Sequence, residues 1–186
     1  MLVVPMLAVG LIIRLSSSGP ALFRQQRVGR DRSTFTFYKF RTMRCDGADT
    51  AHRMLIEREL AGESVEVDGS FKLSGDTRIT RVGHWLRKSS IDELPQLFNV
   101  LSGQMSLVGP RPCLLWEADL FPPAFQARFS VRPGITGLWQ VSGRSRLGTL
   151  EMLMLDVEYV RRRGVVHDLK ILLMTIPSML RGGGAR

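Results

Sequence analysis

The first thirteen residues, MLVVPMLAVGLII, carry no charged side chain and constrain the fold more than any other stretch. A helix that crosses a bilayer needs about 20 apolar residues, so this run is too short to span one. A signal peptide would carry its bases before the apolar run, whereas here the first base, Arg14, follows it. The run therefore predicts either a core helix or a helix that lies at, or re-enters, a membrane surface.

Basic side chains gather directly behind this run. Residues 1–44 hold eight Lys or Arg and one acid, and the whole chain has a net charge of +9. Such a charge suits a nucleic acid, or an anionic membrane together with anionic substrates. Because bases beside an apolar helix gain from anionic lipid, we favour the membrane surface. Residues 45–68 hold seven acids, and we expect a solvated, mobile insertion there.

The length and the hydrophobic content suit one domain with a packed core. The chain has 186 residues, 44% of them hydrophobic, and its two cysteines are too few for a disulfide scaffold. Periodicity and glycine content predict a helix-rich α+β fold. The expected helices cover 1–15, 47–63, 79–88, 91–101, 149–163, 167–181 and one or two segments of 113–130. The expected strands cover 21–24 and 34–40, with loops or short strands over 131–148.

The stretch SSIDELP at 89–95 has both a structural and a chemical interpretation. Ser90 followed by Glu93 matches a capping box, and Pro95 is tolerated in the first turn of a helix. Acids at a helix start also stay ionised beside free N–H groups and the positive end of the helix dipole. There Asp92 or Glu93 could attack a substrate or bind a metal while the other orients it. The pattern leaves both interpretations open.

Two arginine- and lysine-bearing stretches could bind anions. Arg111 stands between two prolines, so its backbone is preset, and its guanidinium could meet a phosphate or a planar base. A surface turn with a solvated arginine is the alternative. Lys39 and Arg41 alternate with aromatic residues along a predicted strand, where a solvated basic face is the alternative. The glycines of 131–144 could admit an anion, but they lack phosphate-loop spacing.

Other catalytic patterns are missing from the sequence. His52, His84 and His167 are far apart, and none pairs with a cysteine at zinc-site spacing. The chain has no Gly-x-Ser-x-Gly elbow and no dinucleotide-binding fingerprint.

Four stretches taken in order resemble one family: FRQQRVGR, FYKFRTM, RITRVGHWLRKSSIDELPQLFNVLSGQMSLVGPRP and VRPGITGLWQVSGR. They resemble the bacterial sugar transferases, the monotopic polyprenyl-phosphate phosphoglycosyl transferases, from about Pro5 to the C-terminus. The resemblance implies a compact catalytic domain over 19–186. It also implies a membrane-associated helix over 1–18, re-entrant or interfacial, and amphipathic surface helices. Members usually have a longer N-terminal segment kinked at Ser-Pro, so we expect this chain to begin near that kink.

The resemblance also implies an activity. Members transfer a sugar-1-phosphate from a UDP-sugar to a polyprenyl phosphate such as undecaprenyl phosphate, release UMP, and so begin polysaccharide or glycoconjugate synthesis. They work at the cytoplasmic face of the bacterial inner membrane, with Mg²⁺ and a covalent enzyme intermediate. On the matching positions, the resemblance implies that Asp92 is the nucleophile and Glu93 its partner, and that both are metal ligands. It implies that the uridine end of the donor binds at Pro110, Arg111 and Pro112. The implied phosphate ligands are Lys39, Arg87 and Arg144.

The implied partners are the UDP-sugar, the polyprenyl phosphate and anionic membrane lipids. Nucleic acid is not among the implied partners, and a homo-oligomer is possible. Two alternatives remain beside the transferase. A basic nucleic-acid-binding protein would lose affinity steeply with salt, and a flotation assay with lipid would separate it from the others. A non-catalytic membrane adaptor of the same fold would show no turnover that depends on Asp92.

Overall fold

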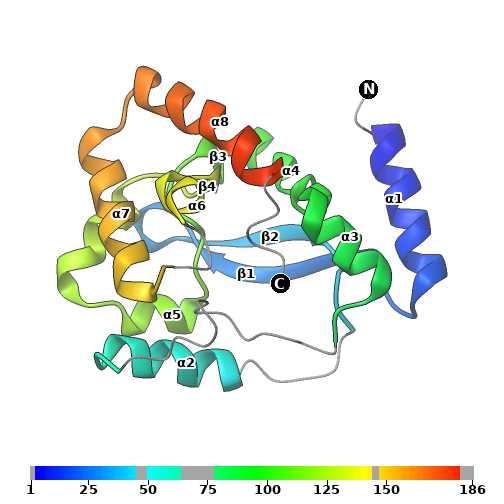
Figure 1. Ribbon diagram of the computed structural model, residues 1–186, viewed down its shortest axis with the longest axis horizontal. Helices are drawn as coiled ribbons and strands as arrows, with labels where there is room; N and C mark the ends of the chain where they lie inside the picture. Colours follow the sequence, from blue (N-terminus) through cyan, green and yellow to red (C-terminus); the bar gives the residue numbers. More distant parts are fainter. Residues whose placement is uncertain (1–2, 45–49, 64–77, 144–146, 181–186) are drawn as a thin grey trace.

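The structure, a computed structural model, describes residues 3–44, 50–63, 78–143 and 147–180. Helices dominate it, and two small two-stranded sheets lie among them, which confirms the helix-rich α+β prediction (Figure 1). The α-helices are α1 (Val3–Ser16), α2 (Thr50–Leu60), α3 (Arg81–Ser89), α4 (Gln96–Leu101), α5 (Leu115–Leu120), α6 (Leu138–Ser142), α7 (Thr149–Arg162) and α8 (Val165–Leu180). The 3-10 helices are η1 (Arg30–Arg32), η2 (Ile91–Glu93) and η3 (Pro123–Ser130).

An antiparallel hairpin of β1 (Leu22–Val28) and β2 (Thr34–Phe40) crosses the middle of the molecule (Figure 1). The predicted strand at 34–40 is confirmed, and the first strand is longer than the predicted 21–24. Phe35 and Phe37 point to one side of β2, where they pack against Met105 in the core. This burial of alternate apolar side chains is what holds a two-stranded ribbon that would be marginal alone.

Helix α1 is tied to the end of this hairpin. Ile13 of α1 is buried against Phe40. Arg41 follows β2 and is itself buried, and its Nη2 atom donates to the carbonyl oxygen of Ser17 at 2.8 Å. Its Nη1 atom donates to the carbonyl oxygen of Ser18. A cation therefore satisfies carbonyl groups at the C-terminal end of α1, and the alternative of a solvated basic face is wrong for Arg41.

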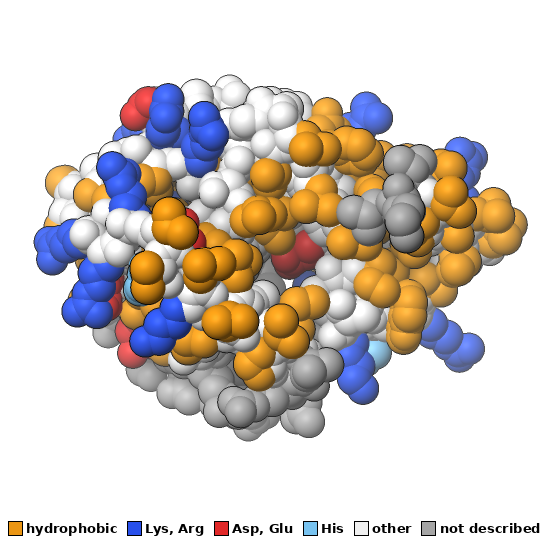
Figure 2. Space-filling view, turned by 90° about the horizontal axis from the view of Figure 1, so that it is seen from above, with side chains coloured by type: hydrophobic (Ala, Val, Ile, Leu, Met, Phe, Trp, Pro, Cys, Tyr) orange, Lys and Arg blue, Asp and Glu red, His pale blue; other side chains and the backbone are white. Residues whose placement is uncertain are grey.

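Two helices expose apolar side chains on one broad face. On α1 these are Val4, Leu7, Leu11, Ile12 and Leu15, and on α8 they are Val165, Val166, Leu169, Leu173, Met174 and Ile176. Figure 2 shows hydrophobic side chains spread over this face, an acidic side chain in a hollow among them, and Lys and Arg at both margins. Among the described residues, no helix combines the length and the apolar character needed to cross a bilayer.

A short parallel sheet of β3 (Ser106–Val108) and β4 (Gly134–Thr136) lies under α7 and α8, in a core cluster with Tyr159 and Ile171. A Cβ atom on Gly134 would lie 2.1 Å from the backbone nitrogen of Gly109, so only glycine allows this approach. The structure thus confirms a short strand in 131–148, while the helix α6 was not predicted there.

The segment 91–101 does not form the single helix that its periodicity predicts. Ser90 ends α3 in the left-handed conformation, with φ of 56°, and its side chain makes no capping bond to the next turn. The capping-box interpretation of Ser90 and Glu93 is therefore wrong. The chain instead makes the single turn η2 and then the short helix α4 after Pro95. This break places Asp92 and Glu93 on a tight turn of their own.

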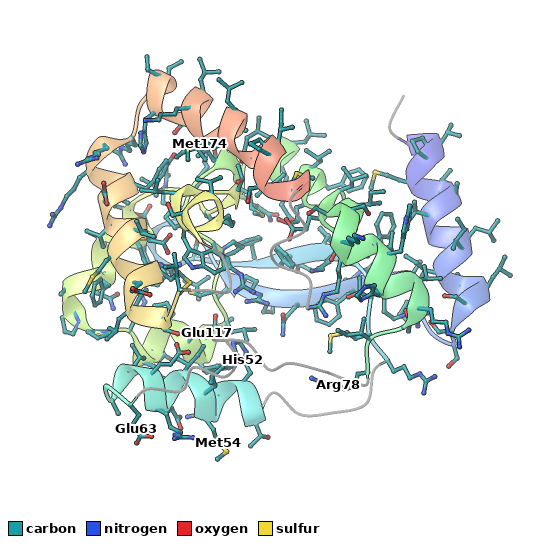
Figure 3. All side chains as sticks on the ribbon, in the orientation of Figure 1. His52, Met54, Glu63, Arg78, Glu117 and Met174 are labelled. Atoms are coloured by element: carbon teal, nitrogen blue, oxygen red, sulfur yellow. The ribbon has the colours of Figure 1, made fainter. Side chains whose placement is uncertain are left out.

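Helix α2 packs against the body, so the prediction of a solvated insertion is wrong over Thr50–Leu60. Ile56 and Glu59 are buried. The Oε2 atom of Glu59 accepts from the backbone nitrogen of Thr149 at 2.8 Å and so caps the start of α7. His52 points toward Glu117 of α5, whereas Met54 points outward (Figure 3). Residues 45–49 and 64–68 of this acidic segment lie outside the described residues.

Candidate functional site

Asp92 lies on the turn η2, which packs against β2 and the end of α3. The residue is only 2% exposed. Taking an ionised carboxylate out of water is strongly unfavourable unless a cation or several donors compensate it. The surroundings of Asp92 therefore have to supply a positive partner.

Lys39 of β2 is that partner. Its Nζ atom lies 2.7 Å from Oδ2 of Asp92, and its side chain is mostly buried. The two residues are far apart in the sequence, and η2 reaches β2 because the chain breaks between α3 and α4. The alternative of a solvated basic face is thus wrong for Lys39 as well as for Arg41. A buried carboxylate beside a lysine is one arrangement for a nucleophile that must stay ionised.

Glu93 and Arg87 lie close to Asp92 along the chain. Glu93 follows it on η2 and is partly exposed. Arg87 is in the last turn of α3 and is partly buried. Among the described residues, no group of three or more His, Cys, Asp or Glu side chains could hold a metal. Mg²⁺ is usually held by one or two carboxylates together with substrate phosphates, so the oxygen atoms of Asp92 and Glu93 fit that ion.

A second candidate group surrounds the turn of Pro110, Arg111 and Pro112. Both prolines are buried, while Arg111 is exposed. The guanidinium carbon of Arg111 lies 5.7 Å from the centroid of the Trp139 ring, which is the range of a cation–π contact. Arg111 is therefore oriented by an aromatic surface rather than freely solvated. Trp139 belongs to α6, the helix that the sequence did not predict.

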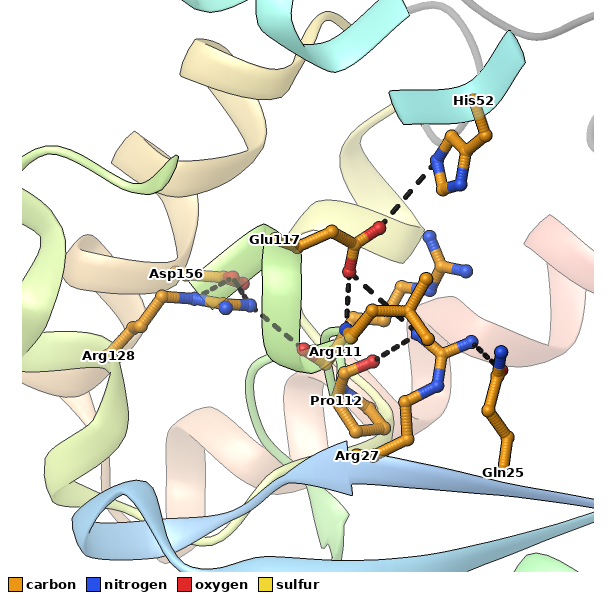
Figure 4. A network of polar contacts seen from close by, with 9 residues as sticks. Gln25, Arg27, His52, Arg111, Pro112, Glu117, Arg128 and Asp156 are labelled. Atoms are coloured by element: carbon orange, nitrogen blue, oxygen red, sulfur yellow. Dashed lines mark hydrogen bonds and ion pairs between the residues drawn. The ribbon is translucent and has the colours of Figure 1, made fainter. Parts of the chain in front are cut away.

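Two ion pairs lie near this turn, one buried and one partly buried (Figure 4). Arg128 of η3 donates from Nε and Nη2 to Oδ2 of Asp156 at 3.0 and 2.7 Å. Arg27 of β1 has its Nη1 atom 3.8 Å from Oε2 of Glu117, and that oxygen also accepts from the backbone nitrogen of Leu114 at 2.6 Å. Sequence reasoning missed these four charged residues. Only Arg27 fell within a quoted motif, and no spacing marked the other three.

The predicted site residues thus form two groups and one remainder, with Glu93 and Arg87 beside Asp92 along the chain. Lys39 and Asp92 come together as an ion pair. Pro110, Arg111 and Pro112 form the second group with Trp139, and no hydrogen bond or ion pair between described residues joins Arg111 to Asp92. Arg144 lies outside the described residues.

Comparisons with known proteins agree with the motifs. Residues 1–182 match a family model described as bacterial sugar transferase. The chain is 42% identical over 188 residues to the galactosyl transferase CpsE of Streptococcus agalactiae, covering 100% of this chain and 40% of that protein. It is 43% identical over 167 residues to the undecaprenyl-phosphate galactose phosphotransferase of Salmonella typhimurium, covering 90% of this chain and 35% of that protein.

A third relative is closer in length. The chain is 43% identical over 185 residues to the UDP-glucose:undecaprenyl-phosphate glucose-1-phosphate transferase of Caulobacter vibrioides, covering 94% of this chain and 62% of that protein. The chain therefore spans less than two thirds of the length of each of these three relatives.

Proposed function

The chain belongs to the bacterial sugar transferase family, and on this premise we propose that it transfers a sugar-1-phosphate from a UDP-sugar to undecaprenyl phosphate or a similar polyprenyl phosphate. The names of two relatives specify undecaprenyl phosphate as the acceptor and galactose or glucose as the sugar. Other relatives are named exopolysaccharide production proteins, which fits a role at the start of polysaccharide synthesis. The single structural observation that carries the proposal is the buried Lys39–Asp92 pair.

Asp92 is the nucleophile in this proposal. An oxygen of its carboxylate forms a bond to the sugar-bearing phosphorus of the UDP-sugar, and the bond from that phosphorus to the bridging oxygen breaks. The electron pair leaves with UMP, and an acyl phosphate that carries the sugar remains on Asp92. A phosphate oxygen of the polyprenyl phosphate then attacks the same phosphorus. This second step gives the polyprenyl diphosphate sugar and restores the Asp92 carboxylate.

Lys39 orients the nucleophile in this scheme. Because Nζ holds Oδ2 at 2.7 Å, we assign the attack to the other carboxylate oxygen, Oδ1. The lysine also keeps a positive charge beside the phosphate that develops negative charge during transfer. Asp92 and Glu93 would hold the Mg²⁺ ion, which supplies charge neutralisation to the pyrophosphate when bound. Arg87 and Arg144 are proposed as further phosphate ligands.

The turn of Pro110, Arg111 and Pro112 binds the uridine end of the donor in this proposal. The guanidinium of the exposed Arg111 offers five donors in a plane, and it lies within cation–π range of the Trp139 ring. A planar group of this kind can stack on a base or bind an oxygen of a phosphate. The turn thus supplies recognition, while Asp92 and Lys39 supply chemistry.

The apolar face of α1 and α8 contacts the cytoplasmic face of the inner membrane in this proposal. Its exposed leucine, valine and isoleucine side chains would be buried among lipid, and the bases at its margins would meet anionic headgroups (Figure 2). The polyprenyl phosphate carries its reacting group at that same boundary. The acceptor could therefore reach Asp92 without leaving the membrane.

The proposal is tested by incubating the detergent- or nanodisc-held protein with Mg²⁺ and a panel of UDP-sugars without acceptor. We expect near-stoichiometric release of UMP and a protein mass increased by one phosphosugar. Asp92→Asn should lower UMP release by about a thousandfold or more and should abolish the adduct. Absence of both UMP and adduct with every UDP-sugar would exclude the covalent route.

Asp119→Asn is the matched control. Asp119 is an acid on α5 whose side chain is 78% exposed and pairs with Arg32 on the surface. Its substitution removes one carboxylate without touching the turn η2, so UMP release should stay at the unmodified level. Equal losses in both variants would mean that net charge, and not the Asp92 carboxylate, governs the reaction.

A further inference from the structure

The backbone of residues 108–113 is held by donors from four different elements. Backbone groups of β1 and β4 and the hydroxyl of Tyr159 on α7 supply three of them, and arginine side chains supply the other two. The recorded donors to carbonyl oxygens are Tyr159 Oη to Val108 at 3.1 Å, Gly134 N to Pro110 at 2.9 Å, Arg128 Nη2 to Arg111 at 2.8 Å, Arg27 Nη1 to Pro112 at 3.3 Å and Val28 N to Cys113 at 3.0 Å. Two successive carbonyl groups of this turn, those of Arg111 and Pro112, therefore accept from charged donors.

Arg128 makes the shorter of the two charged contacts. It is 3% exposed, and its guanidinium is aimed by Oδ2 of Asp156 on one side and by two aromatic rings around it. The ring centroids of Phe121 and Phe129 lie 4.9 and 5.3 Å from its guanidinium carbon. The same Nη2 atom also donates a hydrogen bond to the carbonyl oxygen of Arg111 (Figure 4). Arg128 is thus fixed by its surroundings and fixes Arg111 in turn.

This contact controls where the Arg111 side chain starts. The prolines on either side restrict the backbone of Arg111, and Arg128 holds its carbonyl oxygen. The guanidinium of Arg111 then reaches out over Trp139. If the carbonyl group were released, a small rotation of the Arg111 backbone would move the guanidinium farther than the carbonyl oxygen, because the side chain is long.

We propose that the buried Arg128–Asp156 pair positions Arg111 for binding the nucleotide end of the donor, an inference that rests on the proposed use of Arg111 in binding the UDP-sugar. Arg128 and Asp156 are positioning residues, since neither side chain touches the donor in this scheme. A nucleoside diphosphate is the ligand class whose affinity should report their effect.

Stability alone would not require this pair. A buried ion pair can often be replaced by apolar residues of similar volume without loss of stability. Burial raises the pKa of Asp156, and the positive charges of Arg128 and Arg111 oppose that rise. The link between the pair and Arg111 is the hydrogen bond from Arg128 Nη2 to the Arg111 carbonyl oxygen.

The test replaces both charges at once, by Arg128→Met with Asp156→Leu. The double variant should keep the thermal midpoint of the unmodified protein while it loses the donor to the Arg111 carbonyl. We expect KM for the UDP-sugar, and the Kd for UDP measured by titration without turnover, to rise about tenfold. The value of kcat should change less than about threefold, because the reacting carboxylate is untouched.

The decisive measurement repeats this change in an Arg111→Ala background. If the pair acts through Arg111, the double change should there add nothing to the Kd for UDP, since non-additivity marks residues that act as a unit. A further tenfold rise in that background would overturn the inference. So would an unchanged Kd in the first comparison. Ile56→Ala is the control for general destabilisation; an equal rise of Kd there would also overturn it.

A second variant covers a failure of the double variant to fold. Arg128→Lys keeps a cation for Asp156 but lacks the planar fork that reaches two acceptors, so the same rise in Kd is expected. Failure of the proposed reaction gives a different result. If the protein releases no UMP but binds UDP in a way that depends on Arg111, the proposed reaction is refuted. The Kd values for UDP in the two backgrounds would then still decide this inference. Absent UDP binding to the unmodified protein would overturn the inference itself.

Discussion

The Nζ atom of Lys39 lies 2.7 Å from Oδ2 of Asp92, an acid that is almost wholly buried. This contact joins a strand of the hairpin to the turn between two helices. The carboxylate that we propose as the nucleophile is therefore neither solvated nor isolated. Its orientation depends on a residue from another part of the chain.

Substitution Lys39→Met should remove this cation and leave the buried carboxylate without its partner. We expect about 3 kcal/mol lower unfolding free energy and about a hundredfold lower UMP release. Urea titration and the UMP assay measure the two quantities. Lys39→Arg should retain a larger part of both. Lys88→Met removes an exposed lysine of α3 and should leave both nearly unchanged; if it matches Lys39→Met, the ion pair has no special role.

Substitution Arg41→Ala should loosen α1 from the body. Arg41 donates to partly buried carbonyl groups at the end of that helix, and loss of these charged hydrogen bonds costs about 1–3 kcal/mol. Trypsin should then cleave after Arg14, an exposed residue of α1, several times faster. Arg24→Ala, on the exposed side of β1, is the comparison. Equal cleavage rates in the two variants would contradict this role of Arg41.

Substitution Gly83→Ala should destabilise the fold by about 2–3 kcal/mol through overpacking. An added Cβ atom would lie 2.0 Å from the carbonyl oxygen of Thr42, so α3 would have to move away from the segment after β2. Gly164→Ala is the matched control, since a Cβ atom there would meet nothing within 4 Å. Thermal unfolding of both variants checks the prediction, and similar midpoints would refute it.

Alkaline pH should lower stability partly through Cys113. Burial raises the pKa of its thiol above the ordinary value of 9.0, although the charge of Arg128 opposes the rise. Between 9.0 and the raised pKa, the folded thiol keeps a proton that the unfolded thiol releases. The unfolding free energy therefore falls as pH rises through that window. Burial also raises the pKa of Tyr159, which acts in the same direction.

The measurement for Cys113 is a series of urea titrations between pH 8 and 10.5, read as the slope of unfolding free energy against pH. Cys113→Ala should have a shallower negative slope than Cys45→Ala, which keeps the buried thiol. Identical slopes would assign the alkaline loss to other groups such as Tyr159.

Much of the site could be predicted from the sequence because local patterns carry it. Asp92 and Arg111 stand in short motifs whose residue order suffices to mark them. The pairing of Asp92 with Lys39 could not be predicted, because it depends on the chain break at Ser90. Ser90 adopts a left-handed conformation that its residue type does not demand, and the apolar periodicity of 91–101 hid the break.

The buried charges explain the remaining errors. Arg41 reads as one member of an alternating strand, yet the carbonyl groups of α1 determine its burial. Glu59 reads as part of an acidic, solvated segment, yet it caps α7 from another element. Arg128 and Asp156 carry no motif at all. In each case a contact distant in sequence satisfies the charge, and local pattern contains no information about it.

The tie between Arg41 and α1 has a geometric consequence. Lys39 and Arg41 are two positions apart at one end of β2, where one contacts Asp92, the proposed nucleophile, and the other holds the C-terminal end of α1. The helix end and the Asp92 carboxylate are therefore linked through two neighbouring side chains of one strand end, by one hydrogen-bonded contact and one ion pair. If α1 lies in lipid as proposed, its depth determines the height of the carboxylate relative to the headgroups. The distance that the acceptor phosphate must cover to meet the carboxylate would then depend on the contacts at the end of β2, and not on a flexible arm.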